Sequence, residues 1–106
     1  ASQPIRGNYD VLLAVQPSPV VALNRAVAIG QAQGPAAALP LVQALQTQPQ
    51  LAKYHLLPSV HADLLSRLGR HDEARAHWLR AADLTRNARE RELLLARANN
   101  PRGETQ

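Results

Sequence analysis

The chain has no cysteine, methionine or phenylalanine, and its only aromatic residues are one tryptophan and two tyrosines. Without cysteine there is neither a disulfide nor a thiolate metal site. With so few aromatic rings to stack on bases, direct binding of nucleic acid has less support than binding of a protein. The lack of any methionine leads us to expect either a piece of a longer protein or a chain whose start has been processed off.

Long apolar runs are also missing. No stretch approaches the ~18 residues that a membrane span needs, and no signal peptide is visible. We therefore expect no membrane association and a cytoplasmic location.

Charge of one sign does not dominate any segment, although the net charge is +4. Nine of the twelve basic residues lie between Arg67 and Arg102, but seven of the eight acids lie at or after Asp63. Because basic and acidic residues alternate along this segment, we expect most of them on solvated helix faces. The net positive charge can still attract an acidic partner to the domain. The arginines expected on such faces are Arg75, Arg80, Arg86, Arg89 and Arg91.

The residue patterns of known active sites are absent as well. There is no Ser-His-Asp arrangement, glycine-rich phosphate loop or pair of carboxylates in an apolar setting, so we expect no enzyme activity and no cofactor. The four histidines are His55, His61, His71 and His77, and no two have the i, i+4 spacing of a helical metal pair. We expect no metal site.

Helical periodicity dominates what is present, and it predicts an all-α fold of about six helices. Ser18 with Pro19 is a typical helix start, and Asn87 with Glu90 resembles a capping box. We expect Leu93, Leu94 and Leu95 to turn inward. The expected helices cover residues 4–15, 19–33, 35–47, 58–69, 71–84 and 88–99, within one domain at 1–100 followed by a flexible tail at 101–106.

A repeat signature follows from the segment around Gly69. A leucine-rich helix stops at this glycine, and the next helix carries Ala74, Trp78 and Ala81 on one face, as in a tetratricopeptide (TPR) hairpin. Gly34 lies thirty-five residues earlier, close to the ~34-residue TPR period. The pattern predicts TPR-like hairpins wound into a short right-handed α-solenoid, with Trp78 in the core.

Several segments together resemble one bacterial family. The run 17–28 (Pro-Ser-Pro-Val-Val-Ala-Leu-Asn-Arg-Ala-Val-Ala) is the most specific, and residues 9–13, 34–37, 54–57 and 62–70 support it. They are similar to the TPR-like C-terminal extension of a group of extracytoplasmic-function (ECF) sigma factors. Pro58 and His61 depart from the pattern. The resemblance implies a role in transcription initiation, with promoter recognition left to sigma regions that this chain lacks.

The expected binding surface is the concave groove that the first helix of each TPR hairpin lines. Arginine and asparagine side chains in this groove can form hydrogen bonds with a carboxylate or a peptide backbone. The alternative is structural, with Asn24 bonded to a loop and Arg25 paired with Asp63 or Asp10. Tyr54 and His55 are interpreted as structural. The candidate groove residues are Asn24, Arg25, Gln31, Ser59, Asp63 and Arg67.

Three functions are compatible with these patterns. The first is a regulatory domain that contacts its own sigma regions, core RNA polymerase or a signalling regulator. The second is a TPR adaptor that binds a short peptide of an unrelated partner. The third is a sensor, for which a compact, closed and mostly apolar pocket is expected. The oligomeric state does not follow from the sequence.

Overall fold

The structure is a computed structural model that describes residues 18–100, and all of its regular elements are helical. The helix expected at 4–15 and the tail at 101–106 lie outside the described residues. The five helices expected between residues 19 and 99 are all present. They are α2 (Pro19–Gln33), α3 (Pro35–Ala44), α4 (Leu56–Arg67), α5 (His71–Leu84) and α6 (Ala88–Asn99), with short 3-10 helices η1 (Leu45–Thr47) and η2 (Pro49–Leu51) after α3.

The boundaries of α2 and α3 follow from local chemistry. The Ser18 hydroxyl accepts a hydrogen bond from the amide of Val20 at 3.2 Å, and Pro19 occupies the first helical position, where no amide hydrogen is needed. Gly34 separates α2 from α3 and has a φ of 98°. The α-helical part of α3 ends at Ala44, three residues earlier than expected, and continues as η1 to Thr47.

Helix α4 begins at Leu56, so the expectation that Pro58 opens it was wrong by two residues. A proline in the first turn of a helix removes an amide that has no intrahelical acceptor, and so it is compatible with several start positions. The end is more sharply defined. Gly69 has a φ of 79°, and the amides of Gly69 and Arg70 bond the carbonyls of Ser66 and Leu65. This is the Schellman arrangement, which places its left-handed residue at Gly69.

Replacing Gly69 with alanine is therefore expected to lower the free energy of unfolding by about 1 kcal/mol, because a Cβ atom disfavours the left-handed conformation. Nothing lies within 4 Å of the position of that Cβ, so the cost is one of backbone conformation alone. Urea denaturation measures it. Gly69→Asn is the control, because asparagine tolerates this conformation better. Equal stability of the glycine and alanine proteins would contradict the assignment.

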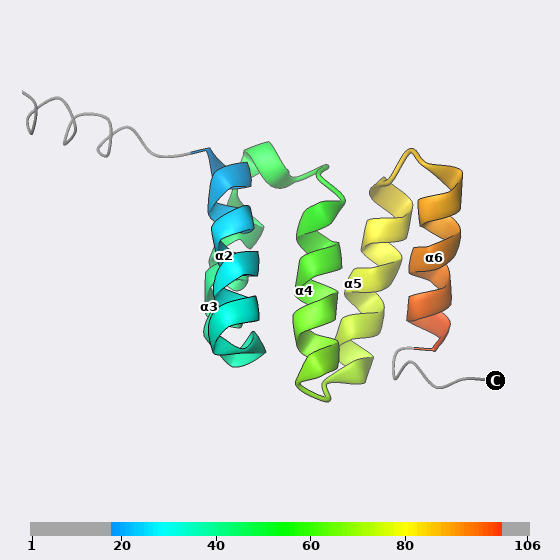
Figure 1. Ribbon diagram of the computed structural model, residues 1–106. Coiled ribbons are helices and arrows are strands. Elements are labelled where there is room, and N and C mark those ends of the chain that lie inside the picture. Colours follow the sequence, from blue (N-terminus) through cyan, green and yellow to red (C-terminus); the bar gives the residue numbers. More distant parts are fainter. Residues whose placement is uncertain (1–17, 101–106) are drawn as a thin grey trace, which may run out of the picture.

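Consecutive helices pack side by side and reverse direction at each connection (Figure 1). Helices α2, α4 and α6 therefore run in the same direction, and each begins at the upper end in Figure 1. Helix α4 contacts α3 and α5 and also touches α2. The parallel orientation of α2, α4 and α6 gives the domain one surface that all three share.

Small side chains permit the close helix contacts. Ala26 of α2, Ala38 of α3, Ala62 of α4, Ala74 of α5 and Ala98 of α6 are at most 1% exposed. Leucines and one large ring fill the remaining space, with Trp78 4% exposed. The expectation that Trp78 belongs to the core is confirmed.

Gly30 lies where α2 is in close contact with both α3 and α4. A Cβ atom at this position would lie 3.1 Å from the Cβ of Ala38 and 3.5 Å from a methyl group of Leu64. Helices α2, α3 and α4 therefore meet at Gly30, and this contact fixes how α2 sits beside α4.

The three leucines of α6 do not all turn inward as expected. Leu94 is 7% exposed, whereas Leu93 is 57% exposed and Leu95 is 39% exposed. Successive helical residues point about 100° apart, so one helix face cannot hold three in a row. Within the described residues, no helix is long and apolar enough to cross a membrane.

Candidate functional site

The surface shared by α2, α4 and α6 contains two adjoining hollows, which we call the groove. The first has a volume of about 240 Å³ and the second about 470 Å³. Ser59, Trp78 and Arg97 line both, so the two hollows adjoin each other. The first is lined by Val27, Gly30, Gln31, Ser59, Val60, Asp63, Leu64, Arg67, Trp78 and Arg97, and the second by Leu56, Ser59, Trp78, Glu90, Leu93, Leu94, Ala96 and Arg97.

Charged side chains meet in the first hollow. Asp63 Oδ2 lies 3.0 Å from Arg67 Nε on the same helix, and Asp63 Oδ1 lies 3.5 Å from Arg97 Nη2 of α6. The arginine side chains are about half exposed, at 55% and 48%. Each pair contributes little to stability because water screens it. What matters for function is that both guanidinium groups remain accessible.

Trp78 is held between the core and this charged cluster. The guanidinium carbon of Arg97 lies 4.3 Å from the centre of the indole ring, a cation–π contact. The Nε1 atom of Trp78 has no hydrogen-bond partner among the described residues. Arg97 therefore links the floor of the groove to Asp63.

The second hollow is mainly apolar. Leu56 at the start of α4 is 38% exposed, and Leu93 of α6 is 57% exposed. Both line the hollow beside Trp78 and Ala96. Exposed leucines that share a concave surface are typical of binding sites, whereas scattered ones are not.

The structure brings four of the six candidate residues together and separates the other two. Gln31, Ser59, Asp63 and Arg67 line the first hollow. Asn24 does not line it, although it lies two turns before Gln31 on the same side of α2.

Arg25 lies elsewhere. Its side chain is exposed. Arg25 follows the buried Leu23 by two residues and precedes Val27, which lines the groove, by two residues. This spacing places it roughly 160° around the helix from each. It does not pair with Asp63, whose partners are Arg67 and Arg97. The other partner considered, Asp10, lies outside the described residues.

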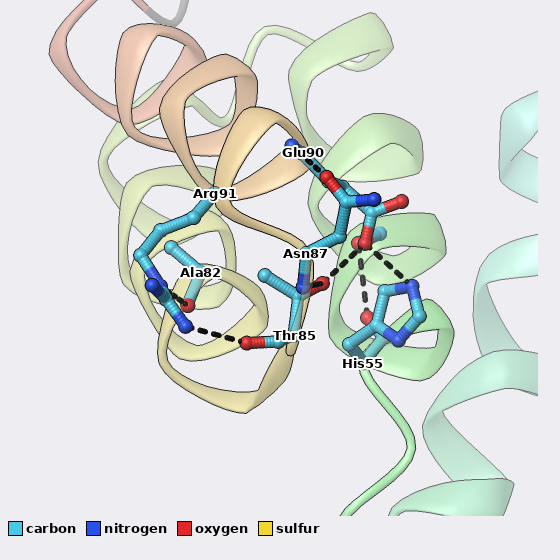
Figure 2. A network of polar contacts seen from close by, with 7 residues as sticks. His55, Ala82, Thr85, Asn87, Glu90 and Arg91 are labelled. Carbon is cyan, nitrogen blue, oxygen red and sulfur yellow. Dashed lines mark hydrogen bonds and ion pairs between the residues drawn. The ribbon is translucent and has the colours of Figure 1, made fainter.

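A polar network fixes the start of α6 against α4 (Figure 2). Glu90 Oε1 accepts a hydrogen bond from the Thr85 hydroxyl at 2.6 Å and lies 2.8 Å from His55 Nε2. The Asn87 side chain caps the helix by accepting from the Glu90 amide at 2.8 Å. Only half of the expected capping box forms, because the Glu90 carboxylate bonds Thr85 and His55 instead of returning to the Asn87 amide.

Arg91 secures the same connection from the other side (Figure 2). Its guanidinium donates to the carbonyls of Thr85 at 2.7 Å and Ala82 at 3.1 Å. Arg91 is exposed, as expected of the arginines on solvated helix faces, and it also bonds these carbonyls, which lie at the end of α5 and lack helical partners. Since the groove depends on where α6 lies, both contacts support it indirectly.

Two histidines stack between α4 and α5, away from the groove. The rings of His61 and His77 lie 3.9 Å apart, and His61 is 6% exposed. Burial, with the nearby His77 and Arg70, lowers the pKa of His61 to about 4. Burial also lowers the pKa of His77. Within residues 18–100, no three side chains of the metal-ligating types cluster to hold a metal ion.

The chain is similar to an uncharacterized protein of Rhizobium meliloti (strain 1021), with 45% identity over 82 residues. The match covers 77% of this chain and 19% of the relative, so the chain spans about a fifth of that protein's length. No protein-family model and no solved structure matches the chain.

Proposed function

We propose that this chain is a protein-interaction domain whose α2–α4–α6 groove binds a polypeptide segment, either of its own longer protein or of a separate partner. The observation that carries the proposal is that two adjoining hollows, on parallel helices, share Ser59, Trp78 and Arg97 as lining residues. A charged half and an apolar half meet at Trp78 and Arg97. We further propose that the helices form a TPR-like right-handed solenoid, since each hairpin presents its first helix to the same surface.

The transcription role is proposed from sequence alone. The resemblance to the ECF sigma factor extension supports a regulatory domain that acts on its own sigma regions, on core RNA polymerase or on a regulator. The small share of the longer relative that the chain matches is compatible with such an extension. The adaptor for an unrelated peptide is the second candidate, and the same groove would serve it.

The sensor function has less support from the geometry. A small-molecule site buries most of its ligand in a closed and largely apolar cavity. Here the larger hollow is bordered by Leu93, which is 57% exposed, and the smaller one holds three charged side chains. An open surface of this kind suits a polypeptide better than a metabolite.

Calorimetric titration tests the proposal. The full 106-residue chain is titrated with the sigma regions of its own longer protein, and separately with core RNA polymerase. We expect saturable binding to one of them at micromolar concentration, weakened about tenfold by Arg67→Ala because an accessible charge contact at the site is lost.

Arg25→Ala is the matched control, because this arginine lies on the opposite side of α2. It is expected to leave binding unchanged. Equal weakening by both substitutions would move the binding surface away from the groove. Absence of binding to either partner at tens of micromolar would overturn the transcription role and leave the adaptor.

A further inference from the structure

In the smaller hollow of the groove the basic groups outnumber the acids, and the acid of the larger hollow, Glu90, is engaged by Thr85 and His55. Two guanidinium groups, those of Arg67 and Arg97, share the single carboxylate of Asp63, and no other acid lines that hollow. The Arg97 contact is long, at 3.5 Å, and uses one nitrogen. Since a guanidinium can bind a carboxylate through two parallel hydrogen bonds, donor capacity remains here for a second carboxylate.

An apolar site adjoins this unbalanced charge. The larger hollow offers the exposed side chains of Leu56 and Leu93, and Trp78 and Arg97 form the wall that the two hollows share. On α6, Leu93 and Arg97 lie four residues apart, so a helical ligand that contacts both presents an apolar side chain and a carboxylate about one helical turn apart. Residues three or four apart on a helix have this separation, roughly 5–6 Å.

We propose that the groove binds an acidic amphipathic helix of a partner protein, with a leucine-like side chain between Leu56 and Leu93 and a carboxylate on Arg67 and Arg97. This rests on the proposed function and specifies the chemistry of its partner. The binding mode is a helix laid into a groove, anchored by residues on one of its faces.

A polyanion such as nucleic acid fits the same surface less well. Asp63 lines the smaller hollow and Glu90 the larger, so successive phosphates would meet carboxylates on both sides. Neither hollow offers an exposed ring for base stacking, because the ring that lines them, that of Trp78, is 4% exposed. The exposed leucines would remain uncovered. A single carboxylate on an otherwise apolar helix face avoids these conflicts.

Binding should also disturb the tryptophan directly. A carboxylate that draws the Arg97 guanidinium away from the indole ring would change the 4.3 Å contact between them. Trp78 is the only tryptophan in the chain, so its fluorescence reports on the groove without a label.

The test uses alanine-based helical peptides of about 16 residues, long enough to populate a helix. One carries leucine followed four residues later by glutamate, and the second has lysine in place of that glutamate. The full chain is titrated with each, and Trp78 fluorescence and calorimetry are recorded. We expect the Leu/Glu peptide to bind with a dissociation constant of about 10–100 μM and the Leu/Lys peptide at least tenfold more weakly.

Charge reversal in the protein makes the test sharper. Arg67→Glu should invert the preference, so that the Leu/Lys peptide binds better, whereas the control Arg75→Ala on the surface of α5 should leave both affinities unchanged. Equal affinity for the two peptides, or no saturable binding of either at about 1 mM, would overturn the inference.

The sigma-region titration separates this inference from the proposed function. If the sigma regions or core polymerase bind with an affinity that Arg67→Ala weakens, but the two peptides bind equally, the proposed function stands and the acidic helix is wrong. If the Leu/Glu peptide binds as expected and neither transcription partner does, the groove chemistry stands and the transcription role fails.

Discussion

Replacing Trp78 with alanine is expected to lower the free energy of unfolding by about 3–5 kcal/mol. The ring is 4% exposed, lies among buried residues of the hydrophobic core and supports the guanidinium of Arg97. The substitution removes the buried area of the largest side chain and leaves a cavity that neighbouring alanines cannot fill. A domain of this size has a total stability of about 5–15 kcal/mol, so the variant should be close to unfolding at 37 °C.

Urea denaturation followed by far-UV circular dichroism measures the effect. Leu79→Ala on the same helix is the matched control, because Leu79 is 37% exposed and its loss should cost well under half as much. A loss below about 1 kcal/mol for Trp78→Ala would mean that the ring does not hold α4, α5 and α6 together.

The second large effect is acid destabilisation between pH 6.5 and pH 4. His61 has a pKa of about 4 in the folded protein, against an ordinary value near 6.5 in the unfolded chain. Between these values the unfolded state binds more protons, so stability is fully present above pH 6.5 and falls as the pH drops towards 4. One pKa unit corresponds to about 1.4 kcal/mol, which gives a loss of about 2–3 kcal/mol, and the lowered pKa of His77 acts in the same direction.

Urea midpoints measured at half-unit intervals from pH 7.5 to pH 4 test this, in the unmodified protein and in His61→Leu. The variant cannot gain the buried charge, so its curve should be much flatter over this window even if its stability at pH 7 differs. An equally steep fall in His61→Leu would assign the acid sensitivity to other groups.

Local signals in the sequence predicted most of the helix boundaries. Helix α5 was predicted at its observed bounds, because Gly69 and Arg70 define the Schellman end of the previous helix before it begins. The start of α4 was misplaced, since Pro58 is compatible with any position in a first turn. Leu93 and Leu95 were misplaced because hydrophobicity alone does not show which face of a last helix is covered.

The groove was predicted less completely than the helices. The polar residues of α4 were correctly expected to face the same surface as Gln31, because the spacing of Ser59, Asp63 and Arg67 is helical. Arg25 was included among the candidates because a guanidinium can bind a carboxylate. The positions of Leu23 and Val27 in the sequence already place it on the side of α2 opposite the groove.

Arg97 was missed, because its partners Asp63 and Trp78 are distant in sequence and meet it only when α4, α5 and α6 pack. A weak signal existed, since Arg97 follows Leu94 by three residues and therefore borders the buried face of its helix. Long-range contacts of this kind are decided by tertiary packing, which a single sequence does not display.

Backbone amide chemical shifts report directly on whether α2, α4 and α6 form one surface for a protein partner. The isotopically labelled 106-residue chain is titrated with the unlabelled sigma regions that the proposed transcription role assigns to its longer protein. We expect the largest shifts around Gln31, Ser59, Asp63 and Arg97 and in the indole signal of Trp78, and little change in the amides near Arg25 and Arg75. Shifts confined to α3 and the outer face of α5, with an unchanged indole signal, would contradict this expectation.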